Sequence, residues 1–400
     1  MLSRRDILKA TGMGAIAASL PAVSFARANT NSRFVLVILR GAADGLAIAA
    51  PYGDANYSKL RGELALPSPD NGGGLFKLDG MFGLHPSLSG VFEEYGKERA
   101  LIVHAVASPY RERSHFDGQD VLENGAANVG ALRDGWLNRA IAPLGGSLGS
   151  EVAIAMAQNT PLVLRGDHSV TSWAPSRLPD ADDSTLRRLE AMYAEDEFFA
   201  ARLAQALKSQ EIAEGQAGLD QTKSRGNDAQ QMRTMMQATA RFLIAADGPR
   251  IAVLEAGGWD THANQGATTG ALANRLSGLD TGLMALRDAL GNAWSQTVVA
   301  VVTEFGRTAA VNGTRGTDHG TASVALLLGG AVNGGRVVAD WPGLDKSDLY
   351  QGRDLKPTAD IRSLFKAVLS EHLSVADSFL NRTVFPDSGA AAPMRDLLRG

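Results

Sequence analysis

Three apolar runs, each followed at once by a polar loop that contains glycine, constrain the fold of this chain more than any other feature. With their loops, the three segments are 34–44, 251–262 and 297–307. Continuous apolar runs of this length, rich in β-branched residues, are typical of strands buried on both faces of a sheet. In an open parallel sheet, the loops that follow the carboxyl ends of the strands meet where ligands bind. We therefore expect the three loops to converge at one edge.

The size and composition indicate a folded, enzyme-sized body. Apolar residues make up 44% of the 400 residues and charged residues 20%, which is far from the composition of disordered chains. We predict a three-layer α/β sandwich with a mostly parallel central sheet, formed by residues 29–400. Apolar residues at helical spacing predict that 181–247 is a helical insertion in this domain.

The amino terminus has the pattern of a twin-arginine signal peptide over residues 1–28. Arg4 and Arg5 precede a weakly apolar run of small residues, and Ala26-Arg27-Ala28 provides a cleavage site of the A-x-A type. The run is shorter than the roughly 20 apolar residues that span a bilayer, which argues against a membrane anchor. The sequence thus predicts a periplasmic protein that engages the twin-arginine export machinery.

Charge and cysteine content exclude several classes of function. The formal net charge is −4 and the body has no cluster of Lys and Arg, so we expect no nucleic-acid partner. The chain has no cysteine, which excludes disulfides, zinc–thiolate sites and thiol nucleophiles. It also lacks the G-x-S-x-G, H-E-x-x-H and P-loop motifs. Any metal must therefore be held by His, Asp, Glu or backbone oxygen.

Oxygen and imidazole donors lie in the loops beside the predicted strands. The candidate metal ligands are Asp44, Asp260, His262, Glu304, Asp318 and His319. Together they provide enough donors for one divalent ion or two, of the zinc, manganese, magnesium or calcium kind. The alternative is structural, because Asp-Gly is a common turn and Asp–His pairs can stabilise loops.

A serine at a predicted helix start is the candidate nucleophile. Ser114 follows the apolar run 100–106 and precedes a helix that continues to about Glu123. Unpaired N–H groups at a helix amino end favour an anionic ligand or an alkoxide. Serine is equally a good N-cap, and the sequence leaves both roles open. His104, inside the apolar run, is more typical of a core histidine than of a ligand.

Five motifs in fixed order give the chain a family resemblance. They are LRGAADGL, RSHFDGQD, GGWDTH, TEFGRT and GTDHG. With its signal, the chain resembles the twin-arginine-exported domain-of-unknown-function family 1501, which is similar in fold to the alkaline phosphatase and sulfatase superfamily. In that superfamily an aspartate ends the first strand, a residue at a helix start is the nucleophile, and later Asp and His residues complete two metal sites.

The resemblance implies roles for particular residues. Ser114 would be the nucleophile. Asp260, His262 and His319 would form one metal site, with Asp44 and Glu304 contributing to the other. The chain departs from the superfamily where Glu304-Phe305 replaces the usual Asp-His, so the second site has lost an imidazole. It departs again at His115, which follows Ser114 and could itself be a ligand.

The function predicted from these features is metal-dependent hydrolysis of a phosphate or sulfate ester by an exported protein. The substrate would be a small anionic ester, and Arg307 or Arg40 would hold its anion by bidentate hydrogen bonds. The alternative is a non-catalytic exported binding or assembly protein that retains the fold, with a protein partner that the sequence does not identify.

Overall fold

A nine-stranded sheet forms the centre of the computed structural model, which describes residues 31–144, 152–175, 183–214 and 228–399. The strand order is β11-β5-β10-β9-β1-β8-β6-β7, with β12 also paired to β5. The strands are β1 Arg33–Leu39, β5 Ala100–Ala107, β6 Ala153–Ala155, β7 Thr171–Ser172, β8 Ile251–Ala256, β9 Thr297–Thr303, β10 Ser323–Leu328, β11 Arg336–Val338 and β12 Ala359–Asp360. All run in one direction except β10, which is antiparallel to both neighbours.

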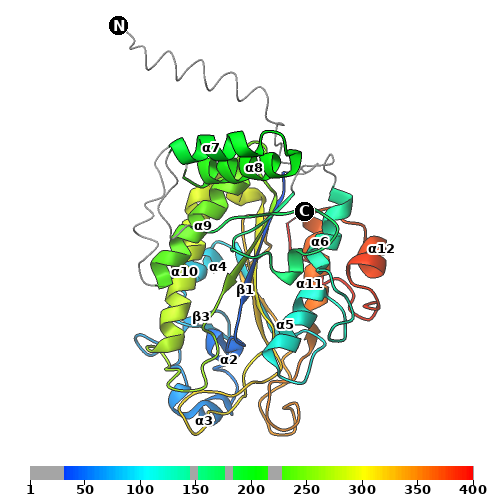
Figure 1. Ribbon diagram of the computed structural model, residues 1–400. Helices are drawn as coiled ribbons and strands as arrows, with labels where there is room; N and C mark the ends of the chain where they lie inside the picture. The colour runs from blue at the N-terminus through cyan, green and yellow to red at the C-terminus, as the bar shows by residue number, and fades with distance from the viewer. Residues whose placement is uncertain (1–30, 145–151, 176–182, 215–227, 400) are drawn as a thin grey trace.

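Helices cover both faces of this sheet, as Figure 1 shows. They are α2 Gly45–Ile48, α3 Tyr57–Arg61, α4 Ser89–Gly96, α5 His115–Asn124, α6 Trp136–Ile141, α7 Asp183–Tyr193, α8 Glu197–Glu214, α9 Asp228–Ile244, α10 Ala271–Leu290, α11 Ile361–Ala367 and α12 Asp377–Phe379. A small antiparallel sheet joins β2 Ala49–Ala50, β4 Gly83–Leu84 and β3 Phe76–Lys77. The predicted three-layer α/β sandwich is confirmed.

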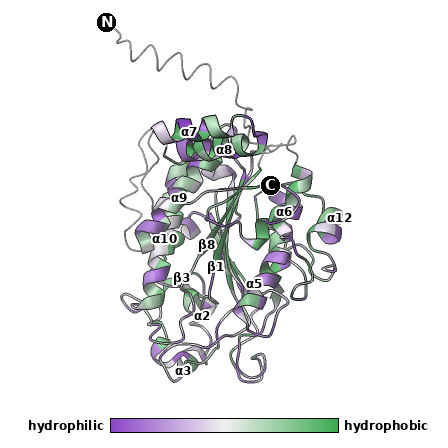
Figure 2. Cartoon of the chain, viewed as in Figure 1, coloured by the Kyte–Doolittle hydropathy of each residue, from purple (hydrophilic) through white to green (hydrophobic). Residues whose placement is uncertain are grey.

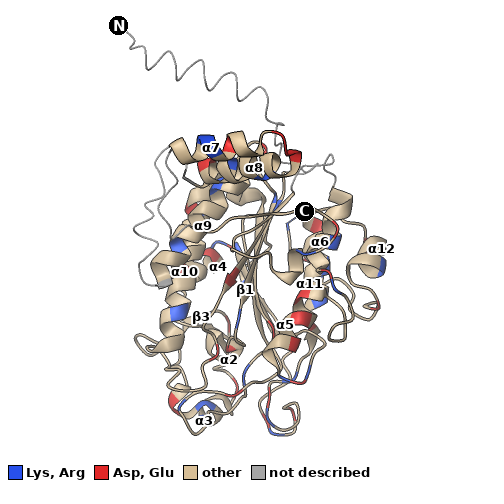
Figure 3. Ribbon diagram, viewed as in Figure 1, with Lys and Arg blue, Asp and Glu red and all other residues tan. Residues whose placement is uncertain are grey.

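Two apolar cores lie on either side of the sheet, because alternate residues of a strand point to opposite faces. Phe34, Leu36 and Ile38 of β1 pack in one core, together with side chains of α6 and α11. Val35 and Val37 pack in the other, together with side chains of α4, α9 and α10. Figure 2 accordingly shows apolar central strands, and Figure 3 shows acidic and basic residues interspersed on the helices.

Helices α7, α8 and α9 occupy the described parts of 181–247, the segment predicted as a helical insertion. Helix α9 packs along α10 at a close approach, since a Cβ at Gly282 of α10 would lie 2.4 Å from the Met232 side chain of α9. The predicted signal peptide lies outside the described residues. Within the described ranges, no helix has the length and apolar character needed to cross a bilayer.

The three key strands end at the same level of the sheet. Leu39 of β1 is in register with Ala256 of β8 and with Thr303 of β9. Strand β5 runs in the same direction, and antiparallel β10 begins at this edge, where Ser323 pairs with Val106. The expected convergence of the loops is therefore confirmed: those after β1, β5, β8 and β9 and the loop before β10 share one edge.

Candidate metal centre

Three segments bring a compact group of three imidazoles and one carboxylate together at this edge. Asp260 and His262 follow β8, His319 precedes β10, and His115 is the first residue of α5. The close packing of the loops depends on glycine, because a Cβ at Gly41 would lie 2.6 Å from the backbone nitrogen of Asp260. Gly41 also has a φ of 120°, which other residues rarely adopt.

The Nε2 atoms of the three histidines converge on the carboxylate of Asp260. His262 Nε2 lies 3.0 Å and His319 Nε2 lies 3.2 Å from Asp260 Oδ1. His115 Nε2 lies 3.4 Å from Asp260 Oδ2. The two nearest imidazoles are 2.9 Å apart at their Nε2 atoms. Donor atoms of His115, Asp260 and His319 all lie within 4.8 Å of one another, close enough to share one metal ion.

The opposite nitrogen of each imidazole, Nδ1, is held by an oxygen acceptor. The partners are Glu304 Oε1 at 2.8 Å for His115, Asp318 Oδ1 at 3.2 Å for His262, and the Arg113 carbonyl oxygen at 2.9 Å for His319. An acceptor at each Nδ1 stabilises the tautomer that carries its proton there, and in that tautomer the Nε2 lone pair points into the cluster. Metal-ligating histidines have this arrangement almost always.

One buried atom in the cluster makes no hydrogen bond. It is His115 Nε2, whose nearest approach to Asp260 is the 3.4 Å distance to Oδ2. A buried polar atom without a partner costs on the order of 1–3 kcal/mol, so it needs an explanation. A metal ion that accepts the Nε2 lone pair would be the missing partner. The side chains present therefore fit a bound cation.

Glu304 is the buried anchor of His115. The carboxylate is fully shielded from solvent and accepts hydrogen bonds from Gly41 N at 2.9 Å and from Gln119 Nε2 at 3.2 Å. Burial raises the pKa of Glu304, but the His115 hydrogen bond and the other donors outweigh it and leave the pKa lowered. The same hydrogen bond to Glu304 raises the pKa of His115. Glu304 therefore stays ionised and the His115 Nδ1 proton is firmly held.

Arg307 holds Asp260 in place and is itself fully buried. Its Nη1 donates to Asp260 Oδ1 at 2.6 Å, and its Nε donates to Thr317 Oγ1 at 3.1 Å. Burial raises the pKa of Asp260, but the hydrogen bond and charge of Arg307 exceed this effect and lower the pKa. Arg307 is thus engaged with Asp260, and its role in holding a substrate anion stays a prediction. Arg40 is also engaged, in ion pairs with Glu123 and Glu255.

Asp44 reaches the predicted edge but lies outside the cluster. Its carboxylate is buried in an ion pair with Arg61 and accepts a hydrogen bond from Gln265 Nε2 at 2.7 Å. Gln265 Oε1 in turn accepts from Thr317 Oγ1 at 2.8 Å, so Asp44 is linked to Arg307 through a buried chain of hydrogen bonds. The Arg61 guanidinium therefore provides the counter-charge of Asp44.

The remaining predicted ligands contact the histidines rather than the centre of the cluster. Glu304 and Asp318 bind the Nδ1 atoms of His115 and His262. His115, which the sequence indicated as a possible ligand without including it among the six candidates, joins Asp260 and His319 in the group. The signal was present in RSHFDGQD, which places an imidazole in the first turn after a strand that ends at the same edge. His104 is a core histidine, as expected: Nε2 donates to the Ala49 carbonyl oxygen at 2.8 Å.

Ser114 immediately precedes the cluster, at the amino end of α5. It occupies the N-cap position with an extended backbone, yet its side chain makes no capping hydrogen bond. The backbone N–H donates to the Tyr110 hydroxyl at 3.0 Å. The hydroxyl is thus not committed to capping the helix, and its role as nucleophile stays a prediction.

Comparisons with known proteins give one family and several distant structures. The model of a family described as “Protein of unknown function (DUF1501)” matches residues 31–384. A search of curated proteins found no match. Among solved structures, the chain is similar to the C-terminal periplasmic domain of EcEptC from Escherichia coli in complex with Zn, with 8% identity, a TM-score of 0.39, and coverage of 78% of this chain and 77% of that chain.

Two further structures have similar scores. One is a phosphonate monoester hydrolase of Agrobacterium radiobacter, with 12% identity, a TM-score of 0.36, and coverage of 77% of this chain and 70% of that chain. The other is Ps i-CgsB in complex with k-i-k-neocarrahexaose, with 11% identity, a TM-score of 0.41, and coverage of 91% of this chain and 77% of that chain.

Proposed function

The chain belongs to the DUF1501 family, and we propose that it is an exported hydrolase that cleaves a phosphate or sulfate ester with one divalent metal ion. The proposed ligands are His115, His262, His319 and Asp260. The observation that carries this proposal is the orientation of the three imidazoles, each held at Nδ1 by an oxygen and each directing Nε2 at the same carboxylate.

The donor set favours one ion of the zinc class. Imidazole nitrogens outnumber oxygens, whereas calcium and magnesium prefer oxygen ligands. Two carboxylates that a second ion would need are engaged elsewhere, since Asp44 pairs with Arg61 and Glu304 holds His115. Across residues 31–144, 152–175, 183–214 and 228–399, one group of His and acidic side chains is close enough to bind a metal.

The surroundings of the cluster favour an anionic substrate. The amino end of α5 presents free backbone N–H groups beside His115. Arg353 donates from Nη2 to the His319 carbonyl oxygen at 2.9 Å, and its side chain is 42% exposed. It is therefore a better candidate than the buried Arg307 for contact with an ester anion.

The chain's own groups can perform the steps that such a reaction needs. When bound, a divalent ion polarises an ester oxygen and stabilises the charge that develops on it. Ser114 would attack the phosphorus or sulfur atom through Oγ, since the positive end of the α5 dipole favours an alkoxide at the N-cap position. Its proton would pass to solvent, the alcohol of the ester would leave, and water would then release the anion from Ser114. Arg307 keeps Asp260 ionised and fixed, so that the carboxylate remains available as a ligand.

Metal content and ester hydrolysis, measured on untagged protein, test the proposal in two separate steps. His262→Ala and His319→Ala should each lower bound metal and melting temperature together, and a chelator should reproduce the loss in the wild type. His168→Ala is the matched control, since His168 lies in another loop with its backbone N–H bound to Asn138. Less than about a tenth of an equivalent of metal after reconstitution would contradict the metal centre.

Hydrolysis is then assayed on p-nitrophenyl phosphate and p-nitrophenyl sulfate with the metal-loaded protein. The proposal expects turnover of one of them, abolished by His319→Ala. Ser114→Ala should remove turnover while leaving bound metal unchanged if Ser114 is the nucleophile. Full metal occupancy without hydrolysis of either ester would contradict the hydrolase and favour the binding or assembly protein.

A further inference from the structure

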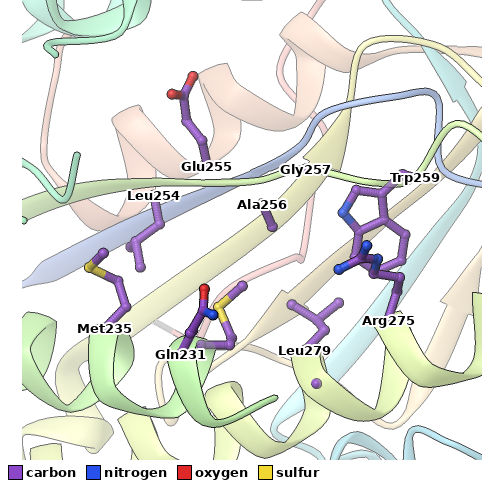
Figure 4. A pocket seen from close by; sticks show the side chains of 11 residues that line it. Gln231, Met235, Leu254, Glu255, Ala256, Gly257, Trp259, Arg275 and Leu279 are labelled. Carbon is purple, nitrogen blue, oxygen red and sulfur yellow. The ribbon is translucent and has the colours of Figure 1, made fainter. Parts of the chain in front are cut away.

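A pocket separate from the metal centre lies between the end of β8 and helices α9 and α10. Its volume is about 210 Å³. Figure 4 shows the side chains around it, and the lining residues from the strand side are Leu254, Ala256, Gly257 and Trp259. None of the four proposed metal ligands lines this pocket. Its existence does not depend on the proposed function.

The pocket contains a buried hydrogen-bond donor without a partner. The Trp259 side chain belongs to the apolar core and is 1% exposed, yet its indole Nε1 makes no hydrogen bond. In Figure 4 the nitrogen lies on the side of the ring that faces the pocket. Buried indole N–H groups usually find an acceptor. A ligand with an acceptor atom would complete this one.

The only charged side chain directed at the same end of the pocket among the described lining residues is that of Arg275. The guanidinium packs on the backbone of Gly258, where a Cβ would lie 2.7 Å from Arg275 Cζ, so glycine makes room for it. The Glu255 carboxylate points away from the pocket and forms an ion pair with Arg40. An indole N–H and a guanidinium together favour a carboxylate.

Apart from Gln231, the rest of the lining is apolar. Met235 of α9 and Leu279 of α10 face Leu254 of β8 across the pocket, and Met232 of α9 also lines it. A small residue, Gly278, leaves room on the α10 side. An apolar cavity of about 150 Å³ holds a benzene ring, so the present volume suits such a ring with a carboxylate attached. Methionine side chains also make favourable contacts with aromatic rings.

We propose that this pocket binds a small aromatic carboxylate, with the ring against Met232, Met235 and Leu279 and the carboxylate bound by Trp259 Nε1 and Arg275. Three probes separate the contribution of the ring from that of the carboxylate. Benzoate has both groups, benzyl alcohol has the ring without the charge, and acetate has the carboxylate without the ring. Calorimetric titration of the metal-loaded full chain should show saturable binding of benzoate and weaker binding of both others.

Three variants assign the binding to this pocket. Trp259→Phe keeps an aromatic ring but removes the N–H, and Arg275→Gln removes the charge. Each should weaken benzoate binding by about tenfold or more, as expected for hydrogen bonds to a charged group. Arg233→Gln is the matched control, because Arg233 is exposed on α9 and does not line the pocket. It should change the Kd by less than about twofold.

Two results would overturn the inference. One is the absence of saturable benzoate binding. The other is benzoate binding at a different place, at the metal centre in particular. In that case acetate would match benzoate in affinity, or both variants would leave benzoate binding unchanged. If Trp259→Phe does not fold, Arg275→Gln decides the question alone, since Arg275 is only partly buried and does not belong to the apolar core, and thermal unfolding checks that the variant is folded.

Discussion

Replacing Glu304 with glutamine should weaken metal binding without disturbing the fold. Glu304 Oε1 accepts from Gly41 N, Gln119 Nε2 and His115 Nδ1, and an amide oxygen can accept the same three bonds. The new NH₂ group would face Thr303 Oγ1, which now donates to Glu304 Oε2 at 2.9 Å. The Leu39 carbonyl oxygen, 2.8 Å from the same hydroxyl, is an alternative acceptor for its single proton, so the hydroxyl can donate to Leu39 and accept from the amide.

The magnitude follows from what the carboxylate does for His115. The hydrogen bond is 2.8 Å long and involves a charged acceptor that is fully buried. Glutamine keeps this hydrogen bond but removes its charge, and mutation of such a partner of a metal-ligating histidine usually costs 10-fold to 100-fold in metal affinity. Glu304→Gln should therefore raise the Kd for zinc by this factor, or about 1.4–2.7 kcal/mol.

Competition with a chromophoric chelator measures the affinity, and thermal unfolding of the metal-free protein confirms the fold. Glu94→Gln is the control, because Glu94 is also fully buried and hydrogen-bonded to Arg99, Arg287 and Trp294, outside the proposed metal site. It should leave the zinc affinity unchanged. A folded Glu304→Gln protein with a Kd within twofold of the wild type would refute the reasoning that Glu304 acts through His115.

Three other changes test the rest of the molecule. Replacing Arg4 and Arg5 together with lysine should block export, and normal periplasmic accumulation on cell fractionation would contradict the signal prediction. Burial lowers the pKa of His104 to about 4, so the unfolded state binds more protons between pH 6.5 and 4. The contribution of neutral His104 to the free energy of unfolding is fully present above about pH 6.5 and falls by about 3 kcal/mol as the pH drops to about 4. The free energy of unfolding from urea titrations should therefore depend less steeply on pH in His104→Gln. Arg61→Met should cost about 3–5 kcal/mol because it leaves Asp44 buried without a counter-charge, and adding Asp44→Asn should recover part of the loss in the same urea assay.

The arrangement around Asp260 explains how an exposed carboxylate can stay ordered. Asp260 is 41% exposed, but Arg307 beneath it is fully buried and held by Thr317. Gln265 joins Thr317 to Asp44, whose own partner Arg61 is also fully buried. The carboxylate therefore rests on a rigid chain of buried polar contacts. Replacement of any of these buried residues is expected to weaken metal binding by displacing Asp260, since none of them is a proposed metal ligand.

The sequence by itself determined the fold class and the edge at which the site forms. Apolar runs such as 34–39 and 298–302 must be buried on both faces, which requires a sheet covered by helices on each side. Parallel strands that end in register carry their loops to one edge, so Asp44, Asp260 and Glu304 could be grouped in advance. The grouping of Asp260, His262 and His319 followed from the family resemblance. The inferences about the fold and the edge depend on local pattern and on a topological rule, and both are visible in one chain.

Only the tertiary structure decided which donors face one another. Whether Glu304 binds a metal or holds His115 depends on side chains that are 189 residues apart in the chain. The same holds for Asp44, which Arg61 engages, and for Arg307, which turns inward to Asp260. Side-chain direction in a loop follows from its backbone angles and its distant neighbours, and neither leaves a periodic signal in the sequence. Packing therefore decides which side chains pair with one another. The motifs had already shown which residues were available to pair.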